Sequence, residues 1–284
     1  MGLVSMKNML DQAKANKYAV GQFNINNLEF TQAIVEAAYE EKSPVIFGVS
    51  EGALKYMGLE FTVAMAKAAA EKYDLPIALH LDHGSSFAVI VQCIRAGFSS
   101  VMFDGSHYGL EENIALTKKV VEIAHNVGVS VEGELGTIGG VEDDLHVDDA
   151  DAKFAKPEEA IYFWNETKVD ALALAVGTAH GVYKGEPKIH YDIIKAVASK
   201  IDAPVVLHGG SGVPDQSIRE AILHGAGKVN VNTENQVACT ETLRSILLKD
   251  SKVIDPRKYM GPAREAMKNV VKNKIRLFGS NAKI

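Results

Sequence analysis

Three histidines of this chain each come shortly after a short apolar run and directly before a glycine. They are His83, His180 and His208. Such runs are typical of buried strands in a parallel sheet, and side chains at the ends of three strands converge only if the strands lie side by side. Three imidazoles with a fourth position left open form the ligand set of a catalytic zinc ion. One such histidine alone is more often packed or capped, so the prediction of a metal site depends on all three. Asp82 directly precedes the first of them.

The elements that must position these side chains follow from the hydrophobic pattern. Eight short apolar runs alternate with stretches that carry apolar residues at helical spacing. The strands are expected at 18–23, 44–49, 77–82, 99–103, 128–134, 170–176, 204–208 and 228–231. This alternation predicts an α/β fold, a parallel sheet closed into a (β/α)8 TIM barrel, with an open doubly wound sheet as the fallback. An additional C-terminal helix is expected over 263–278. The 284 residues suit one barrel of about 250, so we expect a single domain over 1–284.

The composition argues against several other classes of protein. The formal net charge is −6 without a long basic run, so we expect no nucleic-acid partner and no anionic membrane surface. The apolar stretches fall short of the roughly 20 residues that a membrane helix needs, and the N-terminus lacks the apolar core of a signal peptide. Two cysteines, Cys93 and Cys239, give no disulfide framework. We therefore expect a cytoplasmic protein.

Polar side chains stand at nearly every expected strand end, where barrel enzymes carry their active sites. In chain order these ends carry Asn24, Ser50, Asp82 with His83, Asp104, Glu134, His180, His208, and Asn230 with Thr233. Asp104 and Glu134 could bind the metal or only support its ligands. Glu132 alternates with Glu134 along one strand, so both should point into the barrel. His80 is expected to pack or to support the site.

The loops after the last two strands are rich in small residues, and barrel enzymes frequently bind phosphate there through backbone N–H groups. Gly209, Ser211 and Thr233 lie in these loops, and Lys184 could add a positive charge. The alternative is that the glycines merely close the barrel.

Three other segments bear on the mechanism. Residues 136–156 read as a glycine-hinged loop after the fifth strand, either a mobile lid or a solvated excursion. A polar break over 249–262 is expected before the final helix. None of the eight strand runs has a lysine in its interior, which argues against an imine and leaves a metal to polarise any carbonyl.

Five motifs together resemble the class II, zinc-dependent fructose-bisphosphate aldolases, within the class II ketose-bisphosphate aldolase family. They are His80-Leu-Asp-His-Gly84, Val131-Glu-Gly-Glu-Leu-Gly-Thr137, Gly177-Thr-Ala-His-Gly-Val-Tyr-Lys184, His208-Gly-Gly-Ser-Gly212 and Lys228-Val-Asn-Val-Asn-Thr-Glu234. The resemblance covers essentially the whole chain. Tagatose-1,6-bisphosphate and inositol-catabolic aldolases look similar, but the tagatose branch tends to carry alanine where this chain has Asn232.

The resemblance implies reversible cleavage of fructose 1,6-bisphosphate to dihydroxyacetone phosphate and glyceraldehyde 3-phosphate, as in glycolysis and gluconeogenesis. Zinc would be held by His83, His180 and His208. Asp82 matches the residue that exchanges a proton with the C4 oxygen, and Glu142 matches a mobile-loop carboxylate that moves the C3 proton. Glu142 could also be a solvated loop charge.

Further site residues and partners are implied by the same resemblance. The pocket for the dihydroxyacetone-end phosphate would comprise Gly181, Lys184, Gly209, Ser211, Asn230, Asn232 and Thr233. The backbone near Gly181 and Gly209 resembles a site for a monovalent cation, Na+ or K+. Asn24 and Ser50 match residues near the aldehyde half. Arg257 resembles an arginine supplied across the interface of a homodimer or homotetramer, although on sequence alone it could be a surface arginine.

Two other functions remain open at this point. A different metal-dependent barrel enzyme, such as a hydrolase, usually carries a His-x-His pair on its first strand, and here that strand ends Gln22-Phe-Asn24. A non-catalytic barrel that binds sugar phosphates would have little reason to keep Asp82 beside three metal ligands.

Overall fold

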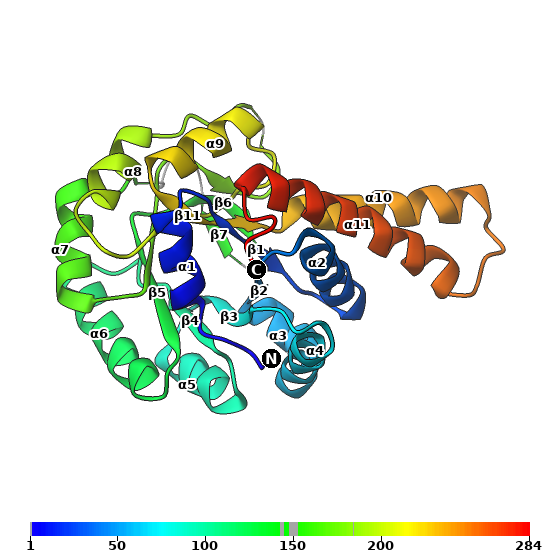
Figure 1. Cartoon of the computed structure of the whole chain (residues 1–284), viewed down its shortest axis with the longest axis horizontal. Helices are drawn as coiled ribbons and strands as arrows, with labels where there is room; N and C mark the ends of the chain where they lie inside the picture. Colours follow the sequence, from blue (N-terminus) through cyan, green and yellow to red (C-terminus); the bar gives the residue numbers. More distant parts are fainter. Residues whose placement is uncertain (1, 143–144, 148–152, 184) are drawn as a thin grey trace.

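Eight parallel strands form a closed barrel in the computed structural model, which describes residues 2–142, 145–147, 153–183 and 185–284, with the backbone alone at 141–142 and 145–147. Around the barrel the strands follow the order β1-β11-β10-β8-β5-β4-β3-β2 (Figure 1). They are β1 (Val20–Asn24), β2 (Val45–Val49), β3 (Ile77–Gly84), β4 (Ser100–Phe103), β5 (Ser130–Leu135), β8 (Ala171–Leu174), β10 (Val205–Leu207) and β11 (Ala226–Val231). The predicted (β/α)8 barrel is confirmed, and the open sheet is excluded because β1 pairs with both β2 and β11.

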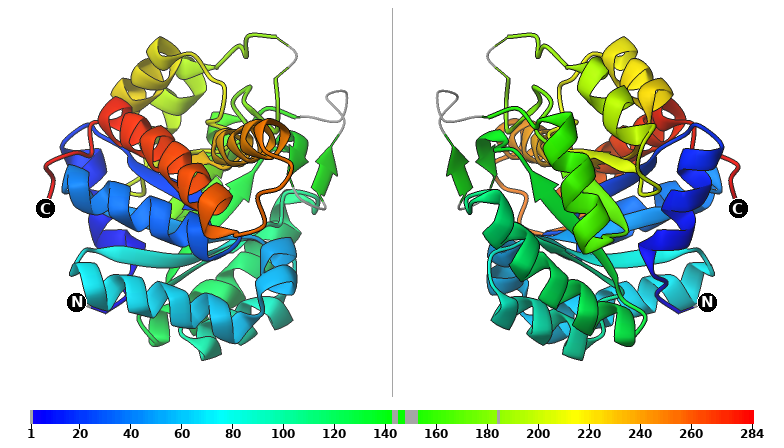
Figure 2. Two further views of the ribbon diagram at one scale, coloured as in Figure 1. Left: turned by 90° about the vertical axis from the view of Figure 1, so that its right-hand side faces the viewer. Right: turned by 90° about the vertical axis from the view of Figure 1, so that its left-hand side faces the viewer.

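Helices surround the barrel (Figure 2), and their apolar side chains form one core cluster with outward side chains of the strands. They are α2 (Leu28–Glu41), α3 (Glu51–Met57), α4 (Leu59–Tyr73), α5 (Phe87–Ala96), α6 (Leu110–Asn126), α7 (Pro157–Thr167), α8 (Tyr191–Ala198) and α9 (Asp215–His224). Helix α10 (Thr233–Lys249) follows the last strand and packs mainly against the final helix. Because both faces of each strand are buried, the strands read as near-continuous apolar runs rather than alternating ones. No described helix is long and apolar enough to cross a membrane.

A helix that the sequence pattern did not predict, α1 (Met6–Ala15), covers the N-terminal end of the barrel. Its buried Met6, Leu10 and Ala13 belong to one apolar cluster with Val20 and Val206, which lie on barrel strands. The backbone N–H of Met6 donates to the Ser130 hydroxyl at 3.2 Å. Helix α1 and the apolar side chains that it contacts close this end of the barrel, and we call them its apolar floor. The C-terminal ends of the strands form the open end.

The segment 136–156, predicted as a loop, contains regular structure. Strands β6 (Gly139–Glu142) and β7 (Leu145–Val147) pair antiparallel, and β6 also pairs parallel with β9 (Ala179–His180). The two hairpin strands lie outside the barrel wall in both views of Figure 2. Strand β6 pairs on its other side with β9, which lies far along the chain, and a local sequence pattern does not reveal such pairing.

The final helix also differs from the prediction. Helix α11 runs over Arg257–Phe278 and includes Pro262, so the predicted polar break is shorter than 249–262. It packs along α2 and α10. Helices α10 and α11 form a hairpin that extends away from the barrel (Figure 1). Arg257 begins α11 at the outer end of this hairpin.

Candidate metal centre and active site

The three predicted ligands meet at the open end of the barrel. His83 comes from β3, His180 from β9 and His208 from the residue after β10. One ring nitrogen of each lies within 4.8 Å of the other two, and His83 Nε2 is 3.0 Å from His208 Nδ1. Two nitrogens bound at about 2.1 Å to one tetrahedral zinc ion would be about 3.4 Å apart. The donor set and its spacing therefore fit a zinc ion.

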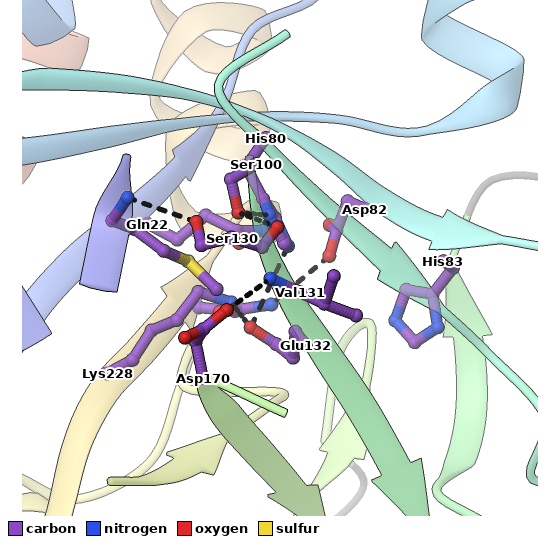
Figure 3. Close-up of polar contacts among 12 residues, drawn as sticks. Gln22, His80, Asp82, His83, Ser100, Ser130, Val131, Glu132, Asp170 and Lys228 are labelled. Atoms are coloured by element: carbon purple, nitrogen blue, oxygen red, sulfur yellow. Dashed lines mark hydrogen bonds and ion pairs between the residues drawn. The ribbon is translucent and has the colours of Figure 1, made fainter. Parts of the chain in front are cut away.

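A backbone irregularity lets two consecutive residues of β3 serve one site. In a regular strand Asp82 and His83 would point to opposite faces of the sheet. The pairing of β3 with β4 shifts between Leu81 and Gly84, and His83 has φ +52°, in the left-handed region. A Cβ on Gly84 would lie 2.5 Å from the Met102 carbonyl oxygen, so glycine is required where the shifted strand rejoins β4. Figure 3 shows Asp82 and His83 side by side on this strand.

Carboxylates orient two of the three imidazoles. Asp104 Oδ2 lies 2.9 Å from His83 Nδ1, and Glu132 Oε1 lies 2.9 Å from His208 Nε2. Asp104 is itself fixed by the backbone N–H and hydroxyl of Ser106. A carboxylate accepts an N–H from the imidazole, so His83 presents Nε2 and His208 presents Nδ1 toward each other. Metal-bound histidines commonly have such partners.

Glu134 lies beside the same histidine and is more buried than Asp104. Its Oε2 is 3.9 Å from His83 Nδ1, and Asp104, Glu134 and His83 form a second group that could hold an ion. Burial, and next the charge of Asp104, raise the pKa of Glu134 well above its usual range. A cation bound nearby would oppose that shift. The structure thus brings Asp104 and Glu134 to the site and hydrogen-bonds Asp104 to a predicted ligand.

Asp82 is fully buried beside the histidines and held by two amides. Asn24 Nδ2 is 3.1 Å from its Oδ2, and Asn230 Nδ2 is 3.4 Å from its Oδ1. Burial opposes ionisation, but positive charge on His83 and His208 outweighs it and holds the pKa of Asp82 below its usual range. The side chain is therefore an ionised carboxylate of fixed orientation.

The loops predicted to bind phosphate meet at the same end of the barrel. The Ser211 hydroxyl accepts the backbone N–H groups of Asn232 and Glu234, each at 3.3 Å, at the start of α10. The Tyr183 hydroxyl accepts the Ala179 N–H and donates to the Gly209 carbonyl oxygen, both at 2.8 Å. Thr233 is the first residue of α10.

Two glycines of these loops have left-handed backbones, with φ +88° at Gly181 and +65° at Gly209. A Cβ on Gly209 would clash with the backbone of Ala179. Lys184 lies outside the described residues.

The remaining predicted site residues are Ser50, Glu142 and Arg257. Ser50 directly follows β2, where its hydroxyl accepts the Ala53 N–H at 3.2 Å and caps α3. Glu142 ends β6, but its side chain is outside the described part of the structure. Arg257 is 89% exposed and pairs with Asp255 at 2.9 Å. Within one chain Arg257 does not reach the site, because it stands at the outer end of the α10–α11 hairpin (Figure 1).

The sequence analysis was wrong about strand lysines. Strand β11 begins at Ala226 rather than 228, so Lys228 lies in its interior and is fully buried. Its Nζ is 2.8 Å from Glu132 Oε2 in the barrel interior (Figure 3). Because a lysine does lie inside a strand, the sequence argument against an imine no longer holds. The Lys228 nitrogen is, however, already paired with Glu132. The buried position of Lys228 could have been inferred from the sequence, because an inward glutamate, Glu132, would need a positively charged partner inside the barrel.

A closed (β/α)8 barrel whose open end gathers three histidines and a fixed carboxylate defines a class of metal-site barrel enzymes. The sequence model described as "Fructose-bisphosphate aldolase class-II" matches residues 4–283, and the chain belongs to that family. This confirms the resemblance seen in the motifs.

Individual relatives match over the whole chain. A fructose-bisphosphate aldolase of Staphylococcus aureus is 54% identical over 284 residues, 99% of each chain. A probable fructose-bisphosphate aldolase of Bacillus subtilis is 53% identical with the same coverage. The crystal structure of the YdjI aldolase from Escherichia coli K12 superposes with a TM-score of 0.86 at 33% identity, covering 99% of both chains. The protein is therefore related to aldolases along its full length.

Proposed function

We propose that this protein is a zinc-dependent lyase that reversibly cleaves fructose 1,6-bisphosphate to dihydroxyacetone phosphate and glyceraldehyde 3-phosphate. The observation that carries the proposal is the Asp82 carboxylate, held by two amides directly beside three converging histidines. The family membership and the names of the Staphylococcus and Bacillus relatives support the choice of sugar.

The metal has a defined place in this proposal. His83, His180 and His208 would hold zinc, with Asp104 orienting His83 and Glu134 close by. A bound zinc ion would supply positive charge that polarises a carbonyl without an imine. The spacing of the three nitrogens supports this assignment.

The chain's own residues carry the proton transfers. Asp82 exchanges a proton with the C4 oxygen of the ketose as the C3–C4 bond breaks or forms. Glu142, on β6, moves the C3 proton of the dihydroxyacetone end. The pairing of Gly140 with His180 supports this role, because it brings β6 alongside a metal-ligand strand two residues before Glu142.

Substrate positioning is assigned to the loops around the site. Backbone N–H groups and hydroxyls at Gly181, Gly209, Ser211, Asn232 and Thr233, with Asn230 and Lys184, orient the dihydroxyacetone-end phosphate. A monovalent cation, Na+ or K+, binds near Gly181 and Gly209. Asn24 and Ser50 contact the aldehyde half.

The assembly is proposed to be a homodimer or homotetramer that acts in the cytoplasm. Arg257 would then contact the far phosphate of a neighbouring subunit's substrate. Its exposure at the outer end of the α10–α11 hairpin supports an action outside its own barrel.

A side-by-side assay tests both the metal and the sugar. Cleavage of fructose 1,6-bisphosphate and of tagatose 1,6-bisphosphate is followed in a coupled assay, before and after exhaustive chelation and zinc restoration. We expect chelation to abolish cleavage, zinc to restore it, and the fructose sugar to be favoured by about 1–3 kcal/mol in kcat/KM. Full activity in metal-free enzyme would refute the metal role. An equal or higher kcat/KM for the tagatose sugar would refute the sugar assignment.

A further inference from the structure

A layer of polar side chains crosses the interior of the barrel between its apolar floor and the candidate metal centre. Gln22, His80, Ser100, Glu132 and Lys228 all point inward and are fully buried. Figure 3 shows them converging from separate strands. A TIM-barrel interior is ordinarily filled by branched apolar side chains, so this charged layer needs a cause.

The layer connects to the metal centre through one continuous line of contacts. Lys228 Nζ lies 2.8 Å from Glu132 Oε2. The other oxygen of Glu132 accepts His208 Nε2 at 2.9 Å, and His208 Nδ1 lies 3.0 Å from His83 Nε2. His80 closes the other side of the carboxylate, with Nε2 at 3.7 Å from Oε2 and Nδ1 at 2.7 Å from the Ser100 hydroxyl.

Packing alone does not account for a lysine at this position. Lys228 is aligned with Val20 on β1 and with Val206 on β10, and both valines are fully buried. An apolar residue would therefore match both neighbours. Replacing a buried ion pair with well-packed apolar side chains is often neutral or stabilising, so the pair is weak evidence for a role in stability.

We propose that Lys228 is a positioning residue for the metal centre. Its ammonium group fixes the Glu132 carboxylate in the one orientation that accepts His208 Nε2–H, and this directs the lone pair of His208 Nδ1 toward the metal. The inference rests on the zinc site of the proposed function. It adds that a residue with no contact to metal or substrate sets the affinity for the ion.

Zinc affinity of the purified full-length protein tests the proposal directly. Zinc is titrated against a chromogenic chelator for the wild type, for Lys228→Met, and for the matched control Lys268→Met. Lys268 also pairs with two carboxylates, Glu40 and Glu265, but these partners are 41% and 52% exposed, and the lysine lies on α11 outside the barrel. Partners that orient a metal ligand are typically worth 10–100-fold in affinity. We expect Lys228→Met to bind zinc about 10–100-fold more weakly and Lys268→Met to match the wild type.

Two double variants keep the test decisive if the single variant does not fold. Both Glu132→Gln/Lys228→Met and Glu132→Leu/Lys228→Met remove the whole charge pair, but only the glutamine can still accept His208 Nε2–H. We expect the glutamine variant to bind zinc the more tightly. We also expect ring ¹⁵N shifts to show the proton on His208 Nε2 only where an acceptor remains.

The outcomes separate this inference from the proposed function. Wild-type zinc affinity in Lys228→Met would overturn the positioning role, as would equal zinc affinity in the two double variants. Failure of the wild type itself to bind zinc would overturn the metal assignment of the proposed function, and the positioning role with it.

Discussion

Asn24 Nδ2 lies 3.1 Å from Asp82 Oδ2, so an amide from the first barrel strand fixes a carboxylate from the third. Asn230 donates to the other oxygen of the same carboxylate at 3.4 Å. Asp82 is therefore held on the side facing the barrel interior while its neighbour His83 faces the metal centre. This division would allow one strand end to supply both the proposed metal ligand and the proposed proton carrier.

Asp82→Asn should retain zinc but lose cleavage. The amide has nearly the shape of the carboxylate but cannot take up a proton, and general acid–base catalysis is typically worth about 10²–10⁴ in rate. We expect kcat to fall by that factor, with metal content unchanged by elemental analysis. Asp11→Asn is the matched control, because Asp11 pairs with Lys7 on the surface of α1. A kcat within a few-fold of the wild type would exclude Asp82 from proton transfer.

Glu142→Ala should slow the exchange of the C3 proton of dihydroxyacetone phosphate with solvent. The carboxylate is the proposed base for that proton, whereas Asp82 acts on the C4 oxygen. Deuterium exchange followed by NMR should therefore fall more in Glu142→Ala than in Asp82→Ala. Glu159→Ala, on exposed α7, is the control. Wild-type exchange in Glu142→Ala would show that another group removes the proton.

The eight barrel strands and the polar residues that follow them could be predicted from the sequence, because buried parallel strands leave a strong apolar signal. The sequence motifs placed Asp82 and His83 in one site, but how two consecutive strand residues reach it could not be predicted, because it depends on a register shift between β3 and β4. Such a shift is a property of pairing between strands and leaves no periodic pattern.

Other features escaped prediction for related reasons. Lys228 reads as a strand boundary in a hydrophobic pattern, because its burial depends on Glu132 from a distant strand. Helix α1 precedes the first strand, where the alternation of strand and helix provides no place for it. The position of Ser50 at a strand end was predicted, but its role as the N-terminal cap of α3 was not.

Tyr183→Phe should weaken binding of the substrate phosphate more than it changes kcat. The Tyr183 hydroxyl links Ala179, beside His180, to Gly209 of the glycine-rich loop. Removing the hydroxyl leaves the Ala179 N–H and the Gly209 carbonyl oxygen without this hydrogen-bond partner. The ordered conformation of the loop should thereby be destabilised by about 1–3 kcal/mol. We expect KM to rise several-fold, measured in the coupled assay, while zinc affinity stays within about two-fold. Tyr162→Phe, on the outer surface of α7, is the control. An unchanged KM would show that this link does not order the loop.

His125 should contribute more to stability in mild acid than in base. His125 Nε2 is 2.8 Å from Asp170 Oδ2, which also accepts the Val131 N–H at 2.8 Å at the start of β5. The hydrogen bond to Asp170 raises the pKa of His125 despite partial burial. Because the folded pKa exceeds the unfolded value of about 6.5, the stabilisation is fully present below that pH and is lost as pH rises through the folded pKa. With 39% of the side chain exposed, solvent screening limits it to at most about 1 kcal/mol.

The difference in unfolding free energy between the wild type and His125→Gln isolates this contribution. Urea unfolding of the two proteins at about pH 6 and about pH 9 should give a larger difference at the lower pH, because a larger fraction of His125 is charged there. The metal centre titrates in both proteins alike, so its effect cancels in the comparison. Salt should reduce the difference at the lower pH, since the pair is partly exposed. A difference that is the same at both pH values would show that the pair contributes no charge-dependent stability.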